Sequence, residues 1–85
     1  MQTVTYTITD ELGIHARPAG QLVKLLQGFT SDVQIACKGK KVNGKGIMAL
    51  MSLAVKKNDE VTFEIEGADE ETAKTEIETF MKENL

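Results

Sequence analysis

Apolar and polar residues alternate along several stretches of the chain, which is the pattern of β-strands that bury one face and leave the other in solvent. The clearest stretch is 3–9, where threonines separate the apolar side chains. Residues 33–37 and 60–66 repeat the alternation, and residues 41–43 are expected as a short strand after the turn at 38–40. The apolar positions of the longer strands are Val4, Tyr6, Ile8, Val33, Ile35, Cys37, Val61, Phe63 and Ile65.

Two other stretches have the 3.6-residue period of an amphipathic helix. The first covers residues 16–27 and is expected to end at Gly28. The second follows Asp69, the expected N-cap, and has Glu70 and Glu71 in its first turn, where the helix dipole favours negative charge. Their apolar stripes are Ala19, Leu22, Val23 and Leu26, and then Ala73, Ile77, Phe80 and Met81. Opposite charges four residues apart predict two ion pairs on the last helix, Glu70–Lys74 and Glu78–Lys82.

Residues 47–55 are almost entirely apolar and lie between a glycine-rich turn and the turn at 56–59. A surface helix that buries one narrow stripe does not need so many apolar residues. Leu50 and Leu53 are expected to point into the core. The remaining large side chains fall on another side of a short helix, where methionine suits an adaptable contact surface: Ile47, Met48 and Met51.

The predicted element order is β-α-β-β-α-β-α. Four strands with one apolar face cannot bury that face alone, so the helices should lie together on it. We therefore expect an α+β fold, an open-faced β-sandwich in which three helices cover one face of a four-stranded antiparallel sheet. We expect one domain over residues 1–85, without a linker or an internal repeat.

Composition excludes several classes of protein. The formal net charge is −3, which argues against a general nucleic-acid binder or a binder of anionic membranes. No apolar run approaches membrane-spanning length, and the N-terminus lacks the regions of a signal peptide. Cys37 is the only cysteine, so a disulfide framework or a cysteine-based zinc site within the chain is ruled out, and a cytoplasmic location is expected. Four lysines near a turn predict a solvated sheet edge: Lys38, Lys40, Lys41 and Lys45.

The one histidine lies where a strand-like segment gives way to a helix-like one. The first N–H groups of a helix have no intrahelical partner and attract anions. Pro18 suits a first helical turn, and Arg17 adds a cation whose forked donors fit phosphate oxygens. Since imidazole is a nucleophile near neutral pH, the segment predicts a phosphoryl-accepting His15, with Ala16, Arg17 and Pro18 as the phosphate-binding residues.

A surface histidine at a helix start is more often a capping or packing residue than a phosphoryl carrier, and an arginine there is usually a solvated helix residue. The adjacent cation and the proline that fixes the helix start favour the functional interpretation for His15 and Arg17. One histidine and one cysteine offer no credible set of metal ligands. No metal and no cofactor are therefore expected.

Over essentially its whole length the chain resembles the HPr family, the histidine-containing phosphocarriers of the bacterial sugar phosphotransferase system. The most specific segments are Gly13–Ala19 and Ile47–Leu53, and Phe29–Val33, Gly39–Asn43 and Glu66–Glu70 also look like the family. The resemblance implies four antiparallel strands covered by three helices. It also implies that enzyme I phosphorylates His15 on a ring nitrogen, with phosphoenolpyruvate as the ultimate donor, and that the phosphoryl group passes to a histidine of an enzyme IIA domain.

Further roles follow from the resemblance alone. Arg17 matches the phosphate-stabilising arginine of the family. The partner-binding residues would be Gly20, Lys24, Ile47, Met48 and Met51. These residues would dock enzyme I and enzyme IIA in turn, with regulatory partners as a further class. The protein would then be a relay and not a turnover enzyme, and we expect it to be a monomer.

The chain departs from the family at two positions. Members from Gram-positive-type bacteria carry a regulatory serine where this chain has Gly46, and glycine has no hydroxyl for the ATP-dependent HPr kinase. Either the lineage lacks that branch of catabolite control, or the chain is a specialised paralogue, or residue 46 has been substituted. A larger side chain than that of Gly20 is also expected next to the active centre.

Three other functions remain as alternatives. A paralogue in a nitrogen-regulatory phosphotransferase chain would use the same chemistry with different partners. A non-carrying regulatory module would bind transcription factors or metabolic enzymes, but such members of the family typically lose the histidine. A small acylphosphate-cleaving hydrolase is disfavoured because no second acid or base stands beside His15 in the motif.

Overall fold

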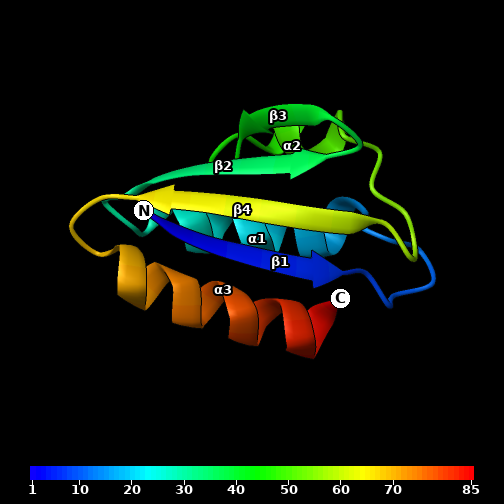
Figure 1. Ribbon diagram of the computed structural model, residues 1–85. Helices are drawn as coiled ribbons and strands as arrows, with labels where there is room; N and C mark the ends of the chain where they lie inside the picture. Colours follow the sequence, from blue (N-terminus) through cyan, green and yellow to red (C-terminus); the bar gives the residue numbers. More distant parts are fainter.

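The computed structural model describes residues 1–85 and has the predicted element order. Four strands and three helices follow one another along the chain (Figure 1). The strands are β1 (Gln2–Thr7), β2 (Asp32–Cys37), β3 (Lys40–Asn43) and β4 (Glu60–Glu66), and the helices are α1 (Ala16–Gln27), α2 (Ile47–Met51) and α3 (Glu70–Asn84).

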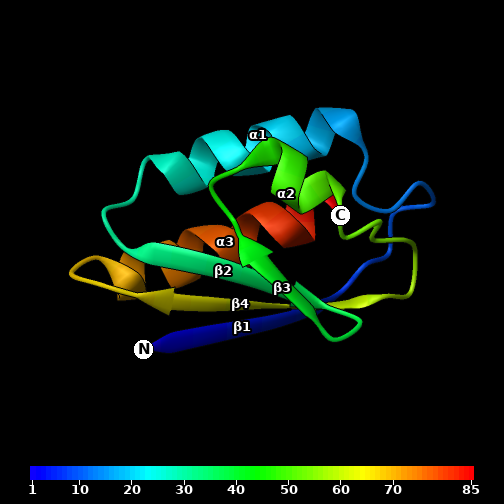
Figure 2. The ribbon, with the colours of Figure 1, turned by 90° about the horizontal axis from the view of Figure 1, so that it is seen from above.

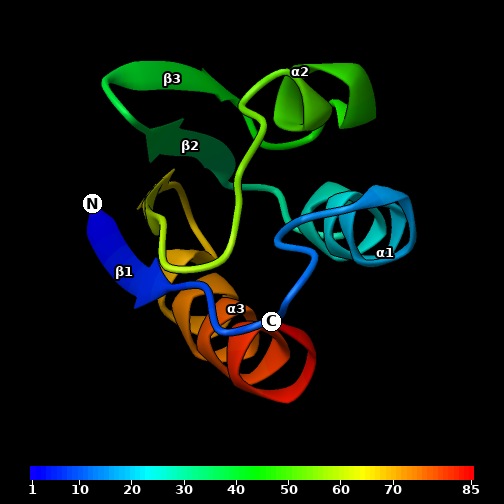
Figure 3. The same ribbon diagram turned by 90° about the vertical axis from the view of Figure 1, so that its right-hand side faces the viewer.

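The strands form one antiparallel sheet in the order β1-β4-β2-β3. All three helices lie on the same side of this sheet (Figures 2 and 3). The register pairs buried positions with each other, for example Val4 with Phe63 and Ile35 with Phe63 on its other side. The predicted α+β open-faced β-sandwich is therefore confirmed.

The core is the apolar layer between the sheet and the helices, a cluster of 21 buried residues. The alternation along β2 and β4 and the stripe of α1 fall on this layer as predicted. Phe80 of α3 is only partly buried at its margin, unlike Ile77 and Met81. The valine and leucine side chains of the buried stripe each contribute on the order of 1.5–3 kcal/mol, so the layer fixes where α1 lies on the sheet.

The apolar run at 47–55 is helical only at Ile47–Met51, so the helix is shorter than the run. The chain turns at Ser52 and Leu53, and Ala54 adopts a positive φ of 50° that ends any helical continuation. Leu50 and Leu53 are buried, as expected. Burial therefore continues beyond the helix because the following loop also packs on the core.

Asp69 occupies the N-cap position of α3, but its side chain does not cap the helix. Instead its carboxylate accepts hydrogen bonds from the backbone N–H groups of Thr30 and Ser31, both at 2.9 Å, and from the Ser31 hydroxyl. Ser31 is buried, and Gly67 packs so closely on it that a Cβ there would lie 2.6 Å from the Ser31 Cα. This Asp69–Ser31 clamp joins the loop after α1 to the loop before α3.

The predicted ion pairs within α3 do not form. Glu70 instead accepts the Gly67 N–H at 3.1 Å and lies 3.0 Å from the amino-terminal nitrogen. Glu78 and Lys82 make no ion pair. Exposed pairs of this kind contribute only about 0.3–0.5 kcal/mol, so a nearby competing partner is enough to replace them.

The lysine-rich turn lies at the edge strand β3, as expected, but its ammonium groups are individually engaged. Lys41 pairs with Glu64 at 2.8 Å across the sheet, and Lys38 pairs with Asp59 at 2.9 Å. Lys45 donates to the Phe29 carbonyl at 2.8 Å, just beyond the C-terminus of α1. These lysines therefore fasten the edge of the sheet to neighbouring segments and do not form a free cationic loop.

Replacing Asp69 by asparagine is expected to lower the melting temperature at pH 7, because an amide cannot match a carboxylate that accepts three hydrogen bonds. The hydrogen bond from the Ser31 hydroxyl, followed by those from the backbone, lowers the pKa of Asp69 from 3.8 to about 2. Since this pKa is lowered on folding, the stabilisation is complete above about pH 4 and is lost as the pH falls through about 2.

Thermal melts of the wild type, Asp69→Asn and the nearby control Asp32→Asn between pH 7 and pH 2 test this. The difference in melting temperature between the wild type and Asp69→Asn should shrink toward low pH, whereas the control should have the wild-type melting temperature at every pH. A difference in melting temperature that does not change with pH would contradict the role assigned to the Asp69 carboxylate.

Candidate functional site

His15 is the N-cap residue of α1, in an extended conformation, and its side chain does not cap the helix. Its carbonyl accepts the Ala19 N–H at 2.9 Å, which is the first hydrogen bond of the helix. The N–H groups of Ala16 and Arg17 donate no hydrogen bond within the protein. The imidazole, 39% exposed, therefore lies beside two free donors at the positive end of the helix dipole.

The three predicted phosphate-binding residues differ in what they can offer. Ala16 is exposed, and its N–H has no partner within the protein. Arg17 is exposed, and its guanidinium makes no ion pair or hydrogen bond, so its forked donors are free for an anion. Pro18 is buried and has no N–H, so it shapes the helix start and donates nothing to a phosphate.

The loop before His15 is held firmly against the segment that follows α2. Gly13 has a φ of 67°, and a Cβ there would lie 2.3 Å from the Val55 carbonyl oxygen. The next residue, Ile14, is buried and donates its N–H to the same oxygen at 3.1 Å. Only glycine fits at position 13, and this contact sets the direction from which the chain reaches His15.

Asp10 lies beside His15 and was not identified from the sequence. Its Oδ1 lies 4.0 Å from the His15 Nε2 and accepts the Leu12 N–H at 2.8 Å. Within the motif no second acid or base stands beside His15, but the fold brings the Asp10 carboxylate next to the ring. The only sequence signal for an acidic group near His15 was this aspartate, which lies in a turn five residues earlier. An aspartate in a turn is also explained by an Asx-turn, so the signal was not specific.

The predicted partner-binding residues of α2 are exposed. The exposed fractions are 42% for Ile47, 82% for Met48 and 39% for Met51, and Leu12 in the loop before His15 is 70% exposed as well. Three large apolar side chains that are exposed together on one short helix form a candidate contact surface. We call Ile47, Met48 and Met51 the α2 patch.

The structure brings Gly20 of α1 next to this patch. A Cβ built on Gly20 would lie 3.8 Å from the Ile47 Cδ1, an ordinary contact, so the close approach of the two helices does not require a glycine. Gln27 on the same helix donates to the Lys45 carbonyl at 3.0 Å, just before α2. Lys24 is exposed and falls between Gly20 and Gln27 on this side of α1 by helical spacing.

Gly46 is the N-cap residue of α2, with a φ of −116° that any residue adopts. A Cβ there would meet only the Ala49 Cβ, at 3.7 Å. The backbone therefore has room for a serine at position 46, but this chain has no hydroxyl there.

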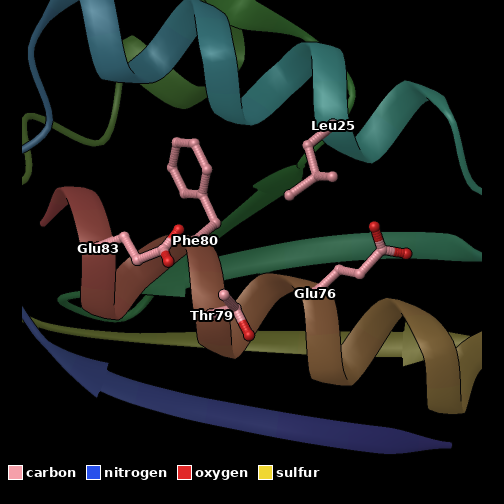
Figure 4. A pocket seen from close by; sticks show the side chains of 5 residues that line it. All are labelled: Leu25, Glu76, Thr79, Phe80 and Glu83. Carbon is pink, nitrogen blue, oxygen red and sulfur yellow. The ribbon is translucent and has the colours of Figure 1, made fainter.

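No cavity lies at His15. A groove of about 220 Å³ lies between α1 and α3, lined by Leu25 and Phe80 with carboxylates around them (Figure 4). It contains none of the predicted site residues. His15 therefore lies on the open surface of the protein.

Three other features were checked: the thiol of Cys37, possible metal ligands and membrane-spanning helices. Cys37 is buried in β2, and burial, followed by the charge of Asp59, raises the pKa of its thiol, which disfavours a reactive thiolate. No group of three His, Cys, Asp or Glu side chains could hold a metal ion. None of the helices is both long and apolar enough to span a bilayer.

Comparisons of the sequence and of the structure with known proteins agree on one family. Residues 2–83 match the family model described as the HPr component phosphorylation site of the phosphotransferase system. The histidine-containing phosphocarrier protein of Mycoplasma superposes with a TM-score of 0.93 at 35% identity, over 96% of this chain and 93% of that one. An HPr from Thermoanaerobacter tengcongensis gives 0.92 at 38% identity, over 96% and 92%.

A catabolite-repression relative also matches. Crh of Bacillus subtilis, crystallised as a dimer with a swapped domain, superposes with a TM-score of 0.77 at 41% identity, over 94% of this chain and 92% of that one. Carrier and regulatory proteins of this fold are thus both similar to the chain, and its own site residues have to distinguish them.

Proposed function

The chain belongs to the HPr family of the phosphotransferase system, and we propose from this that His15 accepts a phosphoryl group from phospho-enzyme I and donates it to enzyme IIA domains for sugar uptake. The observation that carries the proposal is the arrangement at the start of α1. An exposed imidazole lies beside two N–H groups without partners and an arginine without an ion pair.

In the proposed reaction, a lone pair of the neutral His15 ring attacks phosphorus in line with the leaving nitrogen of the donor. The N–H groups of Ala16 and Arg17, together with the Arg17 guanidinium, then bind the phosphoryl oxygens. The helix end contributes about 0.3–2 kcal/mol, depending on burial. A contribution of this size suits a carrier, because a much stronger one would prevent onward transfer.

The exposed position of His15 supports a relay between proteins. The α2 patch offers apolar, adaptable contact area close to α1, and Gly20 and Lys24 extend it along that helix. One face would thus bind enzyme I and enzyme IIA alternately, so that face has to be uncovered, and we expect the protein to be a monomer. Such a relay would act in the cytoplasm.

The experiment that tests this function is intact-mass spectrometry after incubation with phosphoenolpyruvate, magnesium and enzyme I. The wild type should gain one phosphoryl group that acid removes, and His15→Ala should gain none. Sugar-type and nitrogen-type enzyme I run in parallel should show a preference for the sugar type. A folded wild type without any adduct would refute the carrier function and favour a regulatory module such as Crh.

Replacing Arg17 by alanine is expected to slow phosphoryl transfer by at least about tenfold, because the phosphoryl oxygens then keep only neutral donors. The fold should be unchanged, since the side chain is exposed and makes no contact that stabilises it. Rapid-quench rates with phospho-enzyme I measure the effect, and Lys82→Ala on α3 is the control for loss of one positive charge. Equal rates for Arg17→Ala and the wild type would refute the assignment.

Replacing Met48 by glutamate is expected to weaken binding to enzyme I by about tenfold, because a charge would be buried at the centre of the contact. The side chain is 82% exposed, so the melting temperature should stay within about 4 °C of the wild-type value. Calorimetric titration measures the affinity, with Thr72→Glu on α3 as a charge-matched control. Unchanged affinity would show that α2 is not part of the interface.

A further inference from the structure

Asp10 is held more rigidly than a surface loop residue requires. Its N–H donates to the Leu85 main-chain oxygen at 2.9 Å, and its carbonyl accepts the Gly13 N–H at 3.0 Å. Its carboxylate accepts the Leu12 N–H at 2.8 Å. Backbone and side chain are therefore both fixed, and the oxygen that closes the turn is the one that faces His15.

We propose that Asp10 is a positioning residue that keeps the proton of the neutral His15 ring on Nε2 and leaves the lone pair on Nδ1. The proposal rests on the phosphocarrier function of His15. The carboxylate Oδ1 lies 4.0 Å from the Nε2, too long for a hydrogen bond but close enough for a charge to act in a partly exposed site. Such contacts commonly shorten when the partner binds.

No other carboxylate competes for this task. Glu11 is the neighbouring acid, but it pairs with Lys57 at 2.9 Å and its side chain is 85% exposed. The imidazole has no second ion-pair partner. Asp10 is thus the one acidic side chain within 4.0 Å of the Nε2, and the free N–H groups of Ala16 and Arg17 remain for the phosphoryl oxygens.

The carboxylate also bears on the charge that develops during transfer. The Nδ1 lone pair forms the N–P bond, and the donor N–P bond breaks with its electron pair returning to the donor ring. The Nε2 keeps its proton, so the His15 ring gains positive charge as the bond forms. Asp10 faces this positive charge and stabilises it, and the stabilisation is larger in the transition state than in the neutral ring.

The Asp10→Asn variant distinguishes the effect of the charge on His15 from the hydrogen bond that closes the turn. It keeps an oxygen that can accept the Leu12 N–H but carries no charge, whereas alanine removes both. Nitrogen-15 NMR of the imidazole, at a pH where the ring is neutral, should show mainly the Nε2–H tautomer in the wild type and in the control Glu11→Gln. Asp10→Asn should shift the population toward Nδ1–H.

Asp10→Asn should also accept the phosphoryl group about fivefold more slowly, a difference that should shrink in about 1 M salt, where charges are screened over a few ångströms. Two results would overturn the proposal: a wild-type tautomer ratio in Asp10→Asn, or slow phosphoryl acceptance by Asp10→Ala together with a wild-type rate in Asp10→Asn. Either result would leave Asp10 only the role of closing the turn. If the wild type accepts no phosphoryl group, the proposed function fails, while the tautomer ratios still decide the effect of Asp10 on the ring.

Discussion

Burial of the apolar stripe of α1 against the sheet determines where the chemistry of this protein can take place. Leu22 and Leu26 are fully buried in that layer, so the helix can neither rotate nor slide without exposing them. Its N-terminus is therefore held at the margin of the fold, where Ala16 and Arg17 are exposed and their N–H groups have no partner within the protein. The position of this helix end is a consequence of packing elsewhere along the helix.

The loops complete this arrangement by contacts between distant parts of the chain. Gly13 packs on the Val55 carbonyl, and the Leu85 main-chain oxygen accepts the N–H groups of Thr9 and Asp10. The segment leading into His15 is thus tied to the loop after α2 and to the end of α3. The Asp69–Ser31 clamp does the same at the opposite end of α1. Because both ends are fixed, the geometry around His15 is set before any ligand binds.

An exposed histidine without a cavity suits a group that must be handed from one protein to another. An enzyme that completes its own reaction gains from a closed site that excludes water. A relay has to present the same atom to two partners, and the exposed methionines of the α2 patch offer a surface that adapts to both. Gly46 leaves the start of α2 without a hydroxyl, although the backbone there would accommodate a side chain.

The sequence by itself determined the strands, the two long helices, the buried stripe and the histidine at the start of α1. Each of these is a local property: the period of the apolar positions says which side is buried, and Pro18 marks where a helix can begin. Only the tertiary structure decided which distant groups meet. Asp10 came to lie beside His15, Asp69 bound Ser31 and did not cap its own helix, and α2 ended at Met51. These outcomes depend on how loops close over a shared core, and periodicity carries no information about loop closure.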